Sequence, residues 1–511
     1  MKKQFTVSVT FLLSSFLTLT AIKNPNNINV TSLSNKEGFM IQGVANELLG
    51  ATVSSAGDID GDGISDVIVG SYAANPKGRK GAGAGYIIYG KKNGYTKPIS
   101  LANLIPSEGF IIQGAQANDG AGFVNSAGDV NGDGINDVII GASTAGPNNM
   151  PGAGASYVVY GQNHYHPASI DLASLSDSQG FIIQGANPGE RSGNSVSSAG
   201  DVNGDGIDDV IIGAWEASPK NREQAGAAYI VYGKKGGYSG PIKLADLNPD
   251  QGFIVLGAAA GDVCGTSVSS AGDVNNDGIK DVIVGCTRNW ESSANPGYSY
   301  VVYGKKGGYA GSIDLKYLNN YEGFMMQGSL AGDELGRFVN SVGDVNGDSI
   351  DDIIIGAPDF DLNRQQYSGA SYVIYGKTGG YSAPLYLSSL NSSTGFAIQG
   401  ATQANYVGFS VSSAGDINGD KIKDIIVGGY GAGSSYIIFG RKNGYSSPIN
   451  TSAINATLGF TILGTNAGNF GFSVNSAGDV NGDGINDVIV GAIDINNQAG
   501  AAYVIYGRHL S

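Results

Sequence analysis

The chain has 511 residues, of which 41% are hydrophobic, 82 are glycine and only 14% carry a charge. This composition is apolar enough to fold and favours many short strands joined by turns. The balance of 29 basic against 44 acidic residues gives a net charge of −15, which argues against nucleic acid or an anionic membrane as a partner.

The first 22 residues predict export. Met1-Lys2-Lys3 is followed by a run without charge from Phe5 to Ile22, the pattern of a secretory signal. A permanent anchor helix is the alternative, but seven Ser and Thr residues in that run weaken it. No other stretch is apolar enough to predict a membrane span. We therefore expect a secreted or cell-surface protein with residues 1–22 as a signal peptide or anchor.

A nine-residue motif recurs seven times, and one copy is residues 201–209, Asp-Val-Asn-Gly-Asp-Gly-Ile-Asp-Asp. Oxygen-bearing side chains stand at positions 1, 3, 5 and 9, position 6 is usually Gly, and position 7 is always Ile. Alternate spacing places three short polar side chains on one side of a tight loop, and Gly permits the positive φ that folds it. With the backbone carbonyl at position 7, these oxygens predict a Ca²⁺ site, because Mg²⁺ prefers a stricter octahedron and keeps more water.

The residues that follow the motif decide its class. An EF-hand would place a bidentate Glu at position 12 and then a helix. Here position 12 is the apolar Ile212, and residues 209–214 indicate a short buried strand. Dockerin-type repeats differ in the same way, since a helix should follow their loop too. The motif therefore predicts a calcium loop inside a β-hairpin.

The seven predicted calcium loops are residues 58–66, 129–137, 201–209, 273–281, 344–352, 416–424 and 479–487. The predicted ligands are positions 1, 3, 5, 7 and 9 of each loop: Asp58, Asp60, Asp62, Ile64, Asp66, Asp129, Asn131, Asp133, Ile135, Asp137, Asp201, Asn203, Asp205, Ile207, Asp209, Asp273, Asn275, Asp277, Ile279, Asp281, Asp344, Asn346, Asp348, Ile350, Asp352, Asp416, Asn418, Asp420, Ile422, Asp424, Asp479, Asn481, Asp483, Ile485 and Asp487. Half of the acidic residues, 22 of 44, lie in these loops. Calcium is therefore the predicted cofactor, with the role of stapling hairpins rather than catalysing a reaction.

The loops begin 71, 72, 72, 71, 72 and 63 residues apart, and four strand-like segments recur in each period. In the third period they are residues 195–201, 209–213, 227–233 and 252–257. The inner segments are continuous apolar runs, which indicates burial on both faces. The sequence therefore predicts an all-β fold, a seven-bladed β-propeller of four-stranded antiparallel blades with a calcium loop in each blade, over residues 36–508. Residues 241–247 are expected to form a short helical turn or a loop on a blade edge.

The two ends of the repeat array predict how the ring closes. The last period lacks a fourth strand, and residues 38–43 form a strand-like segment outside any complete period. We expect this N-terminal strand to close blade 7 and to remove the open edges. Only residues 508–511 follow the array, so no C-terminal anchor or appended domain is expected.

The two cysteines of the chain, Cys264 and Cys286, flank the fourth calcium loop. They stand at the far ends of its two predicted strands, where a disulfide is compatible with the geometry. Free buried thiols are the alternative, and the sequence does not decide between them.

A resemblance to a known family rests on the residues around the loops. Gly stands ahead of each loop, several times as Leu49-Gly50, Leu335-Gly336, Val407-Gly408 or Phe470-Gly471, and Val/Ile-Gly-Ala follows it, once as Gly356-Ala357-Pro358. These residues resemble FG-GAP repeats, the units of the integrin α-subunit propeller. The resemblance implies calcium held by the loop carboxylates and roles in cell adhesion, ligand binding and docking of a partner subunit. Without a recognisable stalk, inserted domain or cytoplasmic tail, we expect an integrin-α-like propeller alone.

Residues that could support catalysis are scarce. The three histidines are His164, His166 and His509, and neither a repeated nucleophile nor a Gly-rich phosphate loop is present. We therefore expect a binding protein and not an enzyme. A propeller hydrolase or lyase is the least favoured alternative.

The loops between the second and third strands should lie on the face opposite the calcium loops. Both tryptophans, Trp215 and Trp290, fall in adjacent loops of this set. Tyr72, Trp215 and Tyr430 stand two residues after the Gly of the second strand, where the resembling family directs side chains to the upper mouth of the channel. These four aromatic residues are the predicted site for a protein partner or cell-surface receptor. A glycan-binding lectin is the alternative, but it would need the same residues in every upper loop, and these loops differ.

Overall fold

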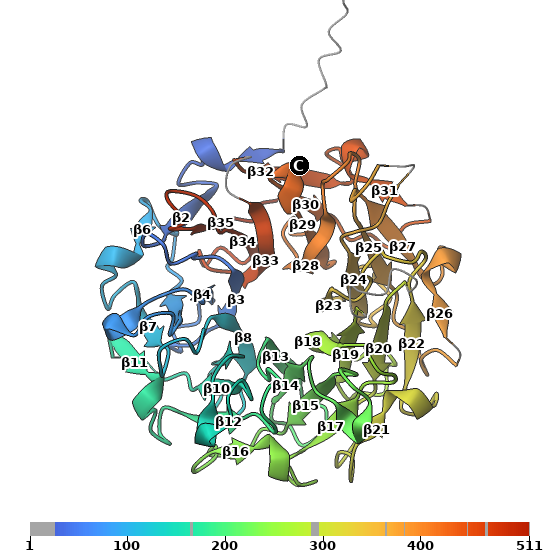
Figure 1. Ribbon diagram of the computed structural model, residues 1–511. Coiled ribbons are helices and arrows are strands. Elements are labelled where there is room, and N and C mark those ends of the chain that lie inside the picture. The colour runs from blue at the N-terminus through green and yellow to red at the C-terminus, as the bar shows by residue number, and fades with distance from the viewer. Residues whose placement is uncertain are drawn as a thin grey trace, which may run out of the picture.

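The structure is a computed structural model that describes residues 26–163, 167–287, 296–362, 365–382, 384–446, 448–465 and 469–509. The expected signal peptide or anchor, residues 1–22, lies outside these ranges. Seven five-stranded sheets stand as blades around a central axis (Figure 1). The predicted all-β seven-bladed propeller is therefore confirmed. Within the described ranges, no helix has the length and apolar character needed to cross a membrane.

Each blade runs outward from the axis through four antiparallel strands. From blade 1 to blade 7 the innermost strands are β3 (Thr52–Gly57), β8 (Phe123–Gly128), β13 (Ser195–Gly200), β18 (Cys264–Gly272), β23 (Phe338–Gly343), β28 (Val407–Gly415) and β33 (Phe470–Gly478). The second strands are β4 (Asp66–Ser71), β9 (Asp137–Ala142), β14 (Asp209–Ala214), β19 (Asp281–Cys286), β24 (Asp352–Ala357), β29 (Asp424–Gly429) and β34 (Asp487–Ala492). Every residue of the second strands is buried, as their continuous apolar runs predict.

The outer half of each blade begins with the third strands, β5 (Ala84–Ile88), β10 (Ala155–Val159), β15 (Ala227–Val231), β20 (Tyr298–Val302), β25 (Ala370–Ile374), β30 (Ser434–Ile438) and β35 (Ala501–Ile505). The fourth strands are β7 (Gly109–Gln113), β12 (Gly180–Gln184), β17 (Gly252–Leu256), β22 (Gly323–Gln327), β27 (Gly395–Gln399), β32 (Gly459–Leu463) and β2 (Gly38–Gln42).

A fifth strand at the outer edge corrects the prediction of four-stranded blades. From blade 1 to blade 7 it is β11 (Ser169–Asp171), β16 (Ile242–Lys243), β21 (Ile313–Asp314), β26 (Leu385–Tyr386), β31 (Ile449–Asn450), β1 (Ile28–Asn29) and β6 (Ile99–Ser100). It pairs in parallel with the fourth strand, as Ile242 does with Ile183. In blades 1 to 5 it belongs to the next repeat in sequence, and in blades 6 and 7 it comes from the N-terminal part of the chain, so each blade is completed by the segment that leads into the next blade around the ring. Two or three residues are too few to give a strand pattern in the sequence.

Short 3₁₀ helices follow the edge strands and lead to the fourth strands. They are η1 (Val30–Ser32), η3 (Leu101–Asn103), η5 (Leu172–Ser174), η7 (Leu244–Asp246), η8 (Leu315–Tyr317), η9 (Leu387–Ser389) and η11 (Thr451–Ala453). Residues 241–247 thus contain both β16 and η7, and Leu244 is buried on the blade. Further 3₁₀ turns, η2 (Pro76–Gly78), η4 (Pro147–Asn149), η6 (Pro219–Asn221) and η10 (Tyr430–Ala432), lie between second and third strands.

The N-terminal segment supplies the two elements that the seventh repeat lacks. β1 is the edge strand of blade 6, where Ile28 pairs with Ile462. β2 is the fourth strand of blade 7 and pairs antiparallel with β35. The N-terminal strand β2 and the C-terminal strand β35 therefore lie side by side in blade 7 (Figure 1).

The hydrophobic core lies between neighbouring blades. In one cluster Ile68 and Ile87 of blade 1 pack with Val138 and Ile140 of blade 2. A corresponding cluster joins blade 7 to blade 1 and includes Phe39 of the N-terminal strand. Because every blade buries both of its faces, the loss of one blade would expose two interfaces.

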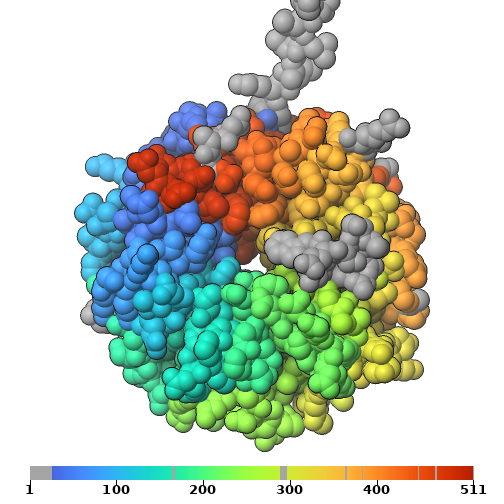
Figure 2. Space-filling view, viewed as in Figure 1, coloured from blue at the N-terminus to red at the C-terminus, as the bar shows by residue number. Residues whose placement is uncertain are grey.

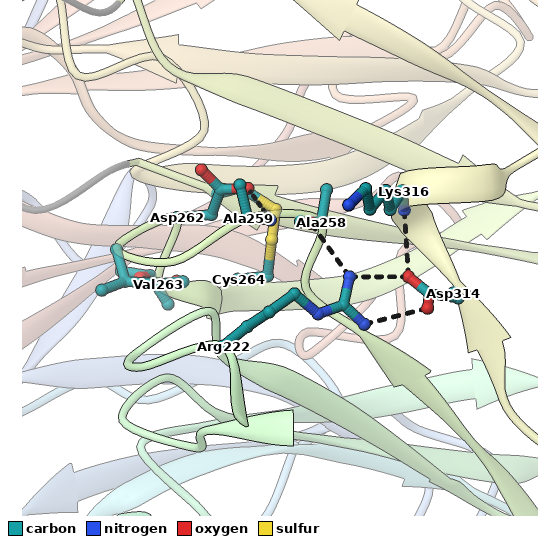
Figure 3. Close-up of a disulfide and its surroundings, with 10 residues drawn as sticks. Arg222, Ala258, Ala259, Asp262, Val263, Cys264, Asp314 and Lys316 are labelled. Carbon is teal, nitrogen blue, oxygen red and sulfur yellow. Dashed lines mark hydrogen bonds and ion pairs between the residues drawn. A yellow bond between two sulfur atoms is a disulfide. The ribbon is translucent and has the colours of Figure 1, made fainter. Parts of the chain in front are cut away.

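Cys264 and Cys286 form a disulfide, which settles the alternative left open by the sequence. The bond joins the first residue of β18 to the last residue of β19. Nearby, Arg222 from the loop after β14 donates to the carbonyl oxygen of Ala258 at 2.9 Å and pairs with Asp314 of β21 at 2.8 Å (Figure 3). The arginine therefore fastens the edge strand of blade 3 to a loop of the same blade.

Candidate metal loops and central channel

All seven motif loops have the same hydrogen-bonded conformation. In the second loop, Asp129 at position 1 accepts from the backbone N–H groups of Asp133 at 3.1 Å and Gly134 at 2.8 Å. Asp133 at position 5 accepts from the N–H of Ile135 at 2.9 Å. The same three bonds recur in every loop. The short polar side chains therefore fold the loop around their own carboxylates.

Position 6 requires a positive φ. Gly134 has a φ of 89°, and Ser349 and Lys421 adopt 72° and 73° at the same position in the fifth and sixth loops. The loop conformation is thus kept without glycine, at a backbone cost of about 1–2 kcal/mol for a residue with a Cβ.

The aspartate at position 9 is buried and joins the loop to the third strand. Asp137 accepts from the N–H of Val130 at 2.9 Å through one carboxylate oxygen and from that of Gly161 at 2.9 Å through the other. Equivalent pairs of bonds hold this aspartate in the other six loops.

Burial makes the ionised form of the position 9 aspartate unfavourable in the absence of a cation. Burial, followed by the charges of Asp133 and Asp129, raises the pKa of Asp137 to about 8. The pKa also rises to about 8 at Asp281, Asp352, Asp424 and Asp487 for the same reasons. Burial likewise raises the pKa of Asp66 and Asp209. A cation among these oxygens would favour the ionised form.

Position 3 provides the sharpest test of whether the loops fit a metal ion. Five of its asparagines have a buried side-chain oxygen without a hydrogen-bond partner: Asn131, Asn203, Asn275, Asn346 and Asn481. An unsatisfied buried carbonyl costs about 1–3 kcal/mol, so its repetition in five loops needs an explanation. In the first loop, carboxylate oxygens of Asp58, Asp60 and Asp66 lie within 4.8 Å of one another. The donor set, oxygen only and largely anionic, fits Ca²⁺.

The sixth loop departs from this pattern. The Oδ1 atom of Asn418 accepts from the N–H of Asp420 at 2.8 Å, so it is already satisfied. No hydrogen bond within the described residues tests whether the backbone carbonyls at position 7 are Ca²⁺ ligands, so this role stays a prediction.

A central cavity of about 410 Å³ opens between the innermost strands, and Figure 2 shows the hollow at the centre of the ring. Its lining begins at residues just before or near the start of these strands, such as Asn194 and Thr266. The metal loops follow the other ends of the same strands, so the mouth lies on the opposite face. Deeper in, Ser54 donates to Asn125 at 2.7 Å and accepts from Asn475 at 3.2 Å, part of a polar belt that ties neighbouring blades together.

Aromatic rings lead from the outer surface into this cavity. Tyr367, which is 42% exposed, stacks on Tyr406 at 5.5 Å, and Tyr406 stacks on Tyr430 at 5.1 Å. Tyr430 contacts Phe409 at 4.4 Å, and Phe409 contacts Phe472 at 4.9 Å. Phe409 and Phe472 line the cavity. We call these five residues the aromatic path.

The rim beside the aromatic path is acidic. Burial, followed by the charges of Asp361 and Asp359, raises the pKa of Asp333 to about 7. Burial and the charge of Glu334 raise the pKa of Asp359 to about 6. Arg337 lies 3.1 Å from Glu334 and lines the cavity with it.

The four predicted partner-binding residues have different positions. Trp215 lines the cavity, and Tyr430 belongs to the aromatic path. Tyr72 is 38% exposed and stacks on Phe123 at 6.5 Å, while Phe123 also lines the cavity. Trp290 lies outside the described residues, as do His164 and His166.

Four phenylalanines that were not predicted from the sequence also line the cavity: Phe123, Phe338, Phe409 and Phe472. A signal was present, since each stands one or two residues after a Gly near the start of an innermost strand. These residues were not predicted because only the loops after the second strands were considered as the lining of the channel mouth.

Comparison with known proteins supports the repeat assignment. Residues 49–88, 121–159, 192–231 and 339–374 match the model of the FG-GAP repeat. These segments run from the start of the innermost strand to the third strand of blades 1, 2, 3 and 5.

Several curated proteins are similar to the chain over part of its length. Integrin alpha pat-2 of Caenorhabditis briggsae is 29% identical over 48% of the chain, and integrin alpha pat-2 of Caenorhabditis elegans is 30% identical over 47%. Phosphatidylinositol-glycan-specific phospholipase D of Bos taurus is 29% identical over 32% of the chain. The aligned part is 18% of the length of each of these relatives.

Proposed function

Since the chain is an FG-GAP-repeat β-propeller of the integrin-α-like type, we propose that it is a calcium-stapled recognition module. Its loops bind Ca²⁺ on one face, and the channel mouth on the other face binds a protein partner. The aromatic path, which runs from exposed Tyr367 to Phe472 in the cavity, is the observation that carries the partner proposal.

The calcium part of the proposal rests on the unsatisfied oxygens at position 3. The side chains at positions 1, 3, 5 and 9 of each loop, with the position 7 carbonyl, would hold the ion. Bound Ca²⁺ supplies positive charge that neutralises the loop carboxylates. The protein positions those oxygens through the backbone hydrogen bonds to positions 1 and 5.

The partner part rests on the chemistry of the mouth. Half-buried aromatic side chains bind well because they bury much area with little loss of conformational entropy. The shortened upper loop of blade 6, which contains η10, leaves the aromatic path accessible. Asp359 and Asp361 beside it favour a partner with basic as well as apolar side chains.

We place this activity outside the cell, where Ca²⁺ is abundant and the disulfide is stable. The uncharged run after Lys3 supports export, and the similarity to integrin α chains supports a cell-surface or secreted role in adhesion.

Two other functions are less well supported. A glycan-binding propeller would present similar aromatic residues in all seven upper loops, whereas the aromatic path is confined to blades 5, 6 and 7. The similarity to a phospholipase D covers a third of the chain. Among the residues that the structure describes, Glu334 is the one carboxylate that lines the cavity, and its pairing with Arg337 does not suit it to act as a base.

The test measures binding of the purified protein to intact animal or bacterial cells in buffer that contains about 1 mM Ca²⁺, the concentration range in which extracellular calcium modules work. The double variant Trp215→Ala with Phe409→Ala should lose at least about 10-fold in affinity, because two anchor residues are removed. Tyr317→Ala is the matched control, since Tyr317 is 71% exposed and lies outside the mouth. A double variant that still binds like the wild type would show that the mouth is the wrong site, and selective binding to a glycan array would favour the lectin.

A further inference from the structure

The eighth residue of a metal loop contacts the loop of the preceding blade rather than its own. Asn136 of the second loop accepts through Oδ1 from the backbone N–H of Asp58 at 3.1 Å. Asp208 of the third loop accepts in the same way from Asp129 at 3.0 Å. Two further pairs repeat this bond, Asp351 with Asp273 at 2.8 Å and Asn486 with Asp416 at 3.0 Å.

The glycine before each loop provides the space for this side chain. Gly57 has a φ of 68°, and a Cβ atom there would lie 2.4 Å from Cγ of Asn136. A Cβ on Gly128 would lie 2.3 Å from Oδ2 of Asp208. Both distances are too short for real atoms, so the glycine and the eighth residue of the next blade form one packed unit.

A backbone bond in the opposite direction completes the contact. The N–H of Asp208 donates to the carbonyl oxygen of Asp129 at 3.1 Å, and the N–H of Asn486 donates to that of Asp416 at 3.1 Å. The first residue of these loops is therefore held at both its N–H and its C=O by the following blade.

That first residue organises its whole loop. The carboxylate of Asp58 accepts from the N–H groups of Asp62 at 3.0 Å and Gly63 at 2.9 Å. Its position depends on its own backbone, which Asn136 fixes. A group that orients a metal ligand commonly changes metal affinity when it is removed.

We infer that the eighth residue of a loop is a positioning residue for the metal site of the preceding blade. Each such site is therefore completed by its neighbour around the ring. This inference rests on the proposed binding of Ca²⁺ by the loops. It adds that a substitution at the eighth position of one loop should weaken Ca²⁺ binding in the loop of the preceding blade.

The chain contains natural exceptions that serve as comparisons. Position 8 is Lys280 in the fourth loop, Lys423 in the sixth and Ser65 in the first. A lysine ammonium group cannot accept a hydrogen bond, and Lys280 instead pairs with Asp351 at 3.0 Å. In the described part of the chain no side chain accepts from the N–H of Asp201, Asp344 or Asp479, so these three sites lack the positioning bond.

The experiment follows hydrogen exchange of individual loops during a Ca²⁺ titration, read by mass spectrometry of peptides from the intact protein. In Asn136→Ala, half-protection of residues 58–66 should need about 10- to 100-fold more Ca²⁺ than in the wild type. Residues 129–137, which contain the substitution, should shift by less than about twofold. Asn136→Asp should restore the wild-type response, because Asp208 makes the same bond with a carboxylate.

Two further variants keep the test decisive. Asp208→Ala should raise the Ca²⁺ concentration needed for half-protection of residues 129–137 in the same way. It provides a second site in case one variant misfolds. Lys423→Ala should leave the Ca²⁺ concentration needed for half-protection of residues 344–352 unchanged, because Lys423 makes no positioning bond to that loop. The inference is overturned if the Ca²⁺ dependence of protection of residues 58–66 is unchanged in Asn136→Ala, or if only residues 129–137 change. If no loop of the wild type gains protection from Ca²⁺, the proposed calcium binding itself is wrong.

Discussion

Ile41 of the N-terminal strand pairs with Ala502 of the C-terminal strand across the middle of blade 7. The pairing places the start of the described chain on the edge of β35, which would otherwise be open. Ile28 extends the same segment to blade 6 by pairing with Ile462. The ring is therefore closed by two consecutive elements of one N-terminal segment.

The first prediction is that removal of this segment opens the ring. A protein that begins at Leu48 loses β1 and β2, and it should be less stable and self-associate compared with one that begins at Asn26. Phe39 and Ile41 are buried, and each contributes about 1.5–3 kcal/mol. Exposed strand edges promote aggregation. Denaturant unfolding and size-exclusion chromatography measure both effects.

A protein that begins at Asn35 provides the graded control. It keeps β2 but lacks β1 and η1, so it should lie between the other two in stability. Equal stability and a monomeric state for all three proteins would contradict the account of closure.

The second prediction concerns the ion pair of Arg222. Burial alone would raise the pKa of Asp314, but hydrogen bonds from Arg222 and Lys220 hold it at about 2, below its ordinary value of 3.8. Because the pKa is lowered on folding, this stabilisation is present above about pH 4 and is lost as the pH falls towards 2. Since Lys220 shares this effect, Arg222→Met should lower the free energy of unfolding by about 1 kcal/mol at pH 6 and by about half of that at pH 3.

Denaturant unfolding of both proteins at the two pH values gives this difference. Lys243→Met is a control, since Lys243 is an exposed residue of β16. A difference that is the same at pH 6 and pH 3 would show that Arg222 acts by packing and not by charge.

The third prediction concerns the sixth loop, which we expect to bind Ca²⁺ most weakly. Lys421 holds a φ of 73° that suits glycine, and it adds a basic residue between the predicted ligands Asp420 and Ile422. Asn418 has already used its Oδ1 within the loop. Lys421→Gly should stabilise the protein by about 1 kcal/mol, because it relieves the positive φ, and should tighten the sixth site, because it removes a positive charge near the bound cation. Loop-resolved hydrogen exchange during a Ca²⁺ titration checks the order of the sites, and a sixth loop that fills first would contradict it.

Much of the fold could be predicted because the repeat makes each element visible seven times. The runs around Asp209 and Tyr229 recur at a nearly constant period, so strand order and closure followed from counting. The edge strands could not be predicted in this way. Ile242 and Lys243 form a strand only because Ile183 and Gln184 of the preceding blade lie beside them.

The candidate sites also divide into features that are local in sequence, which could be predicted, and features that depend on contacts between distant segments, which could not. The loop ligands are local in sequence, and their geometry follows from the spacing of Asp129, Asn131 and Asp133. The aromatic path is not local, because Tyr367 and Tyr430 belong to different blades and meet through Tyr406. The disulfide also depended on strand register, which sets Cys264 opposite Cys286.

The central claim, that Ca²⁺ staples the seven loops, is tested most directly by the thermal unfolding midpoint of the full chain. It is measured with excess Ca²⁺, with Mg²⁺ alone and with a chelator. Each site filled at about 100 times its Kd adds about 2.7 kcal/mol, so the account predicts a midpoint at least about 10 °C higher in Ca²⁺ than in chelator. Mg²⁺ should recover only a small part of this difference. A midpoint that is the same in Ca²⁺ and in chelator would contradict the claim.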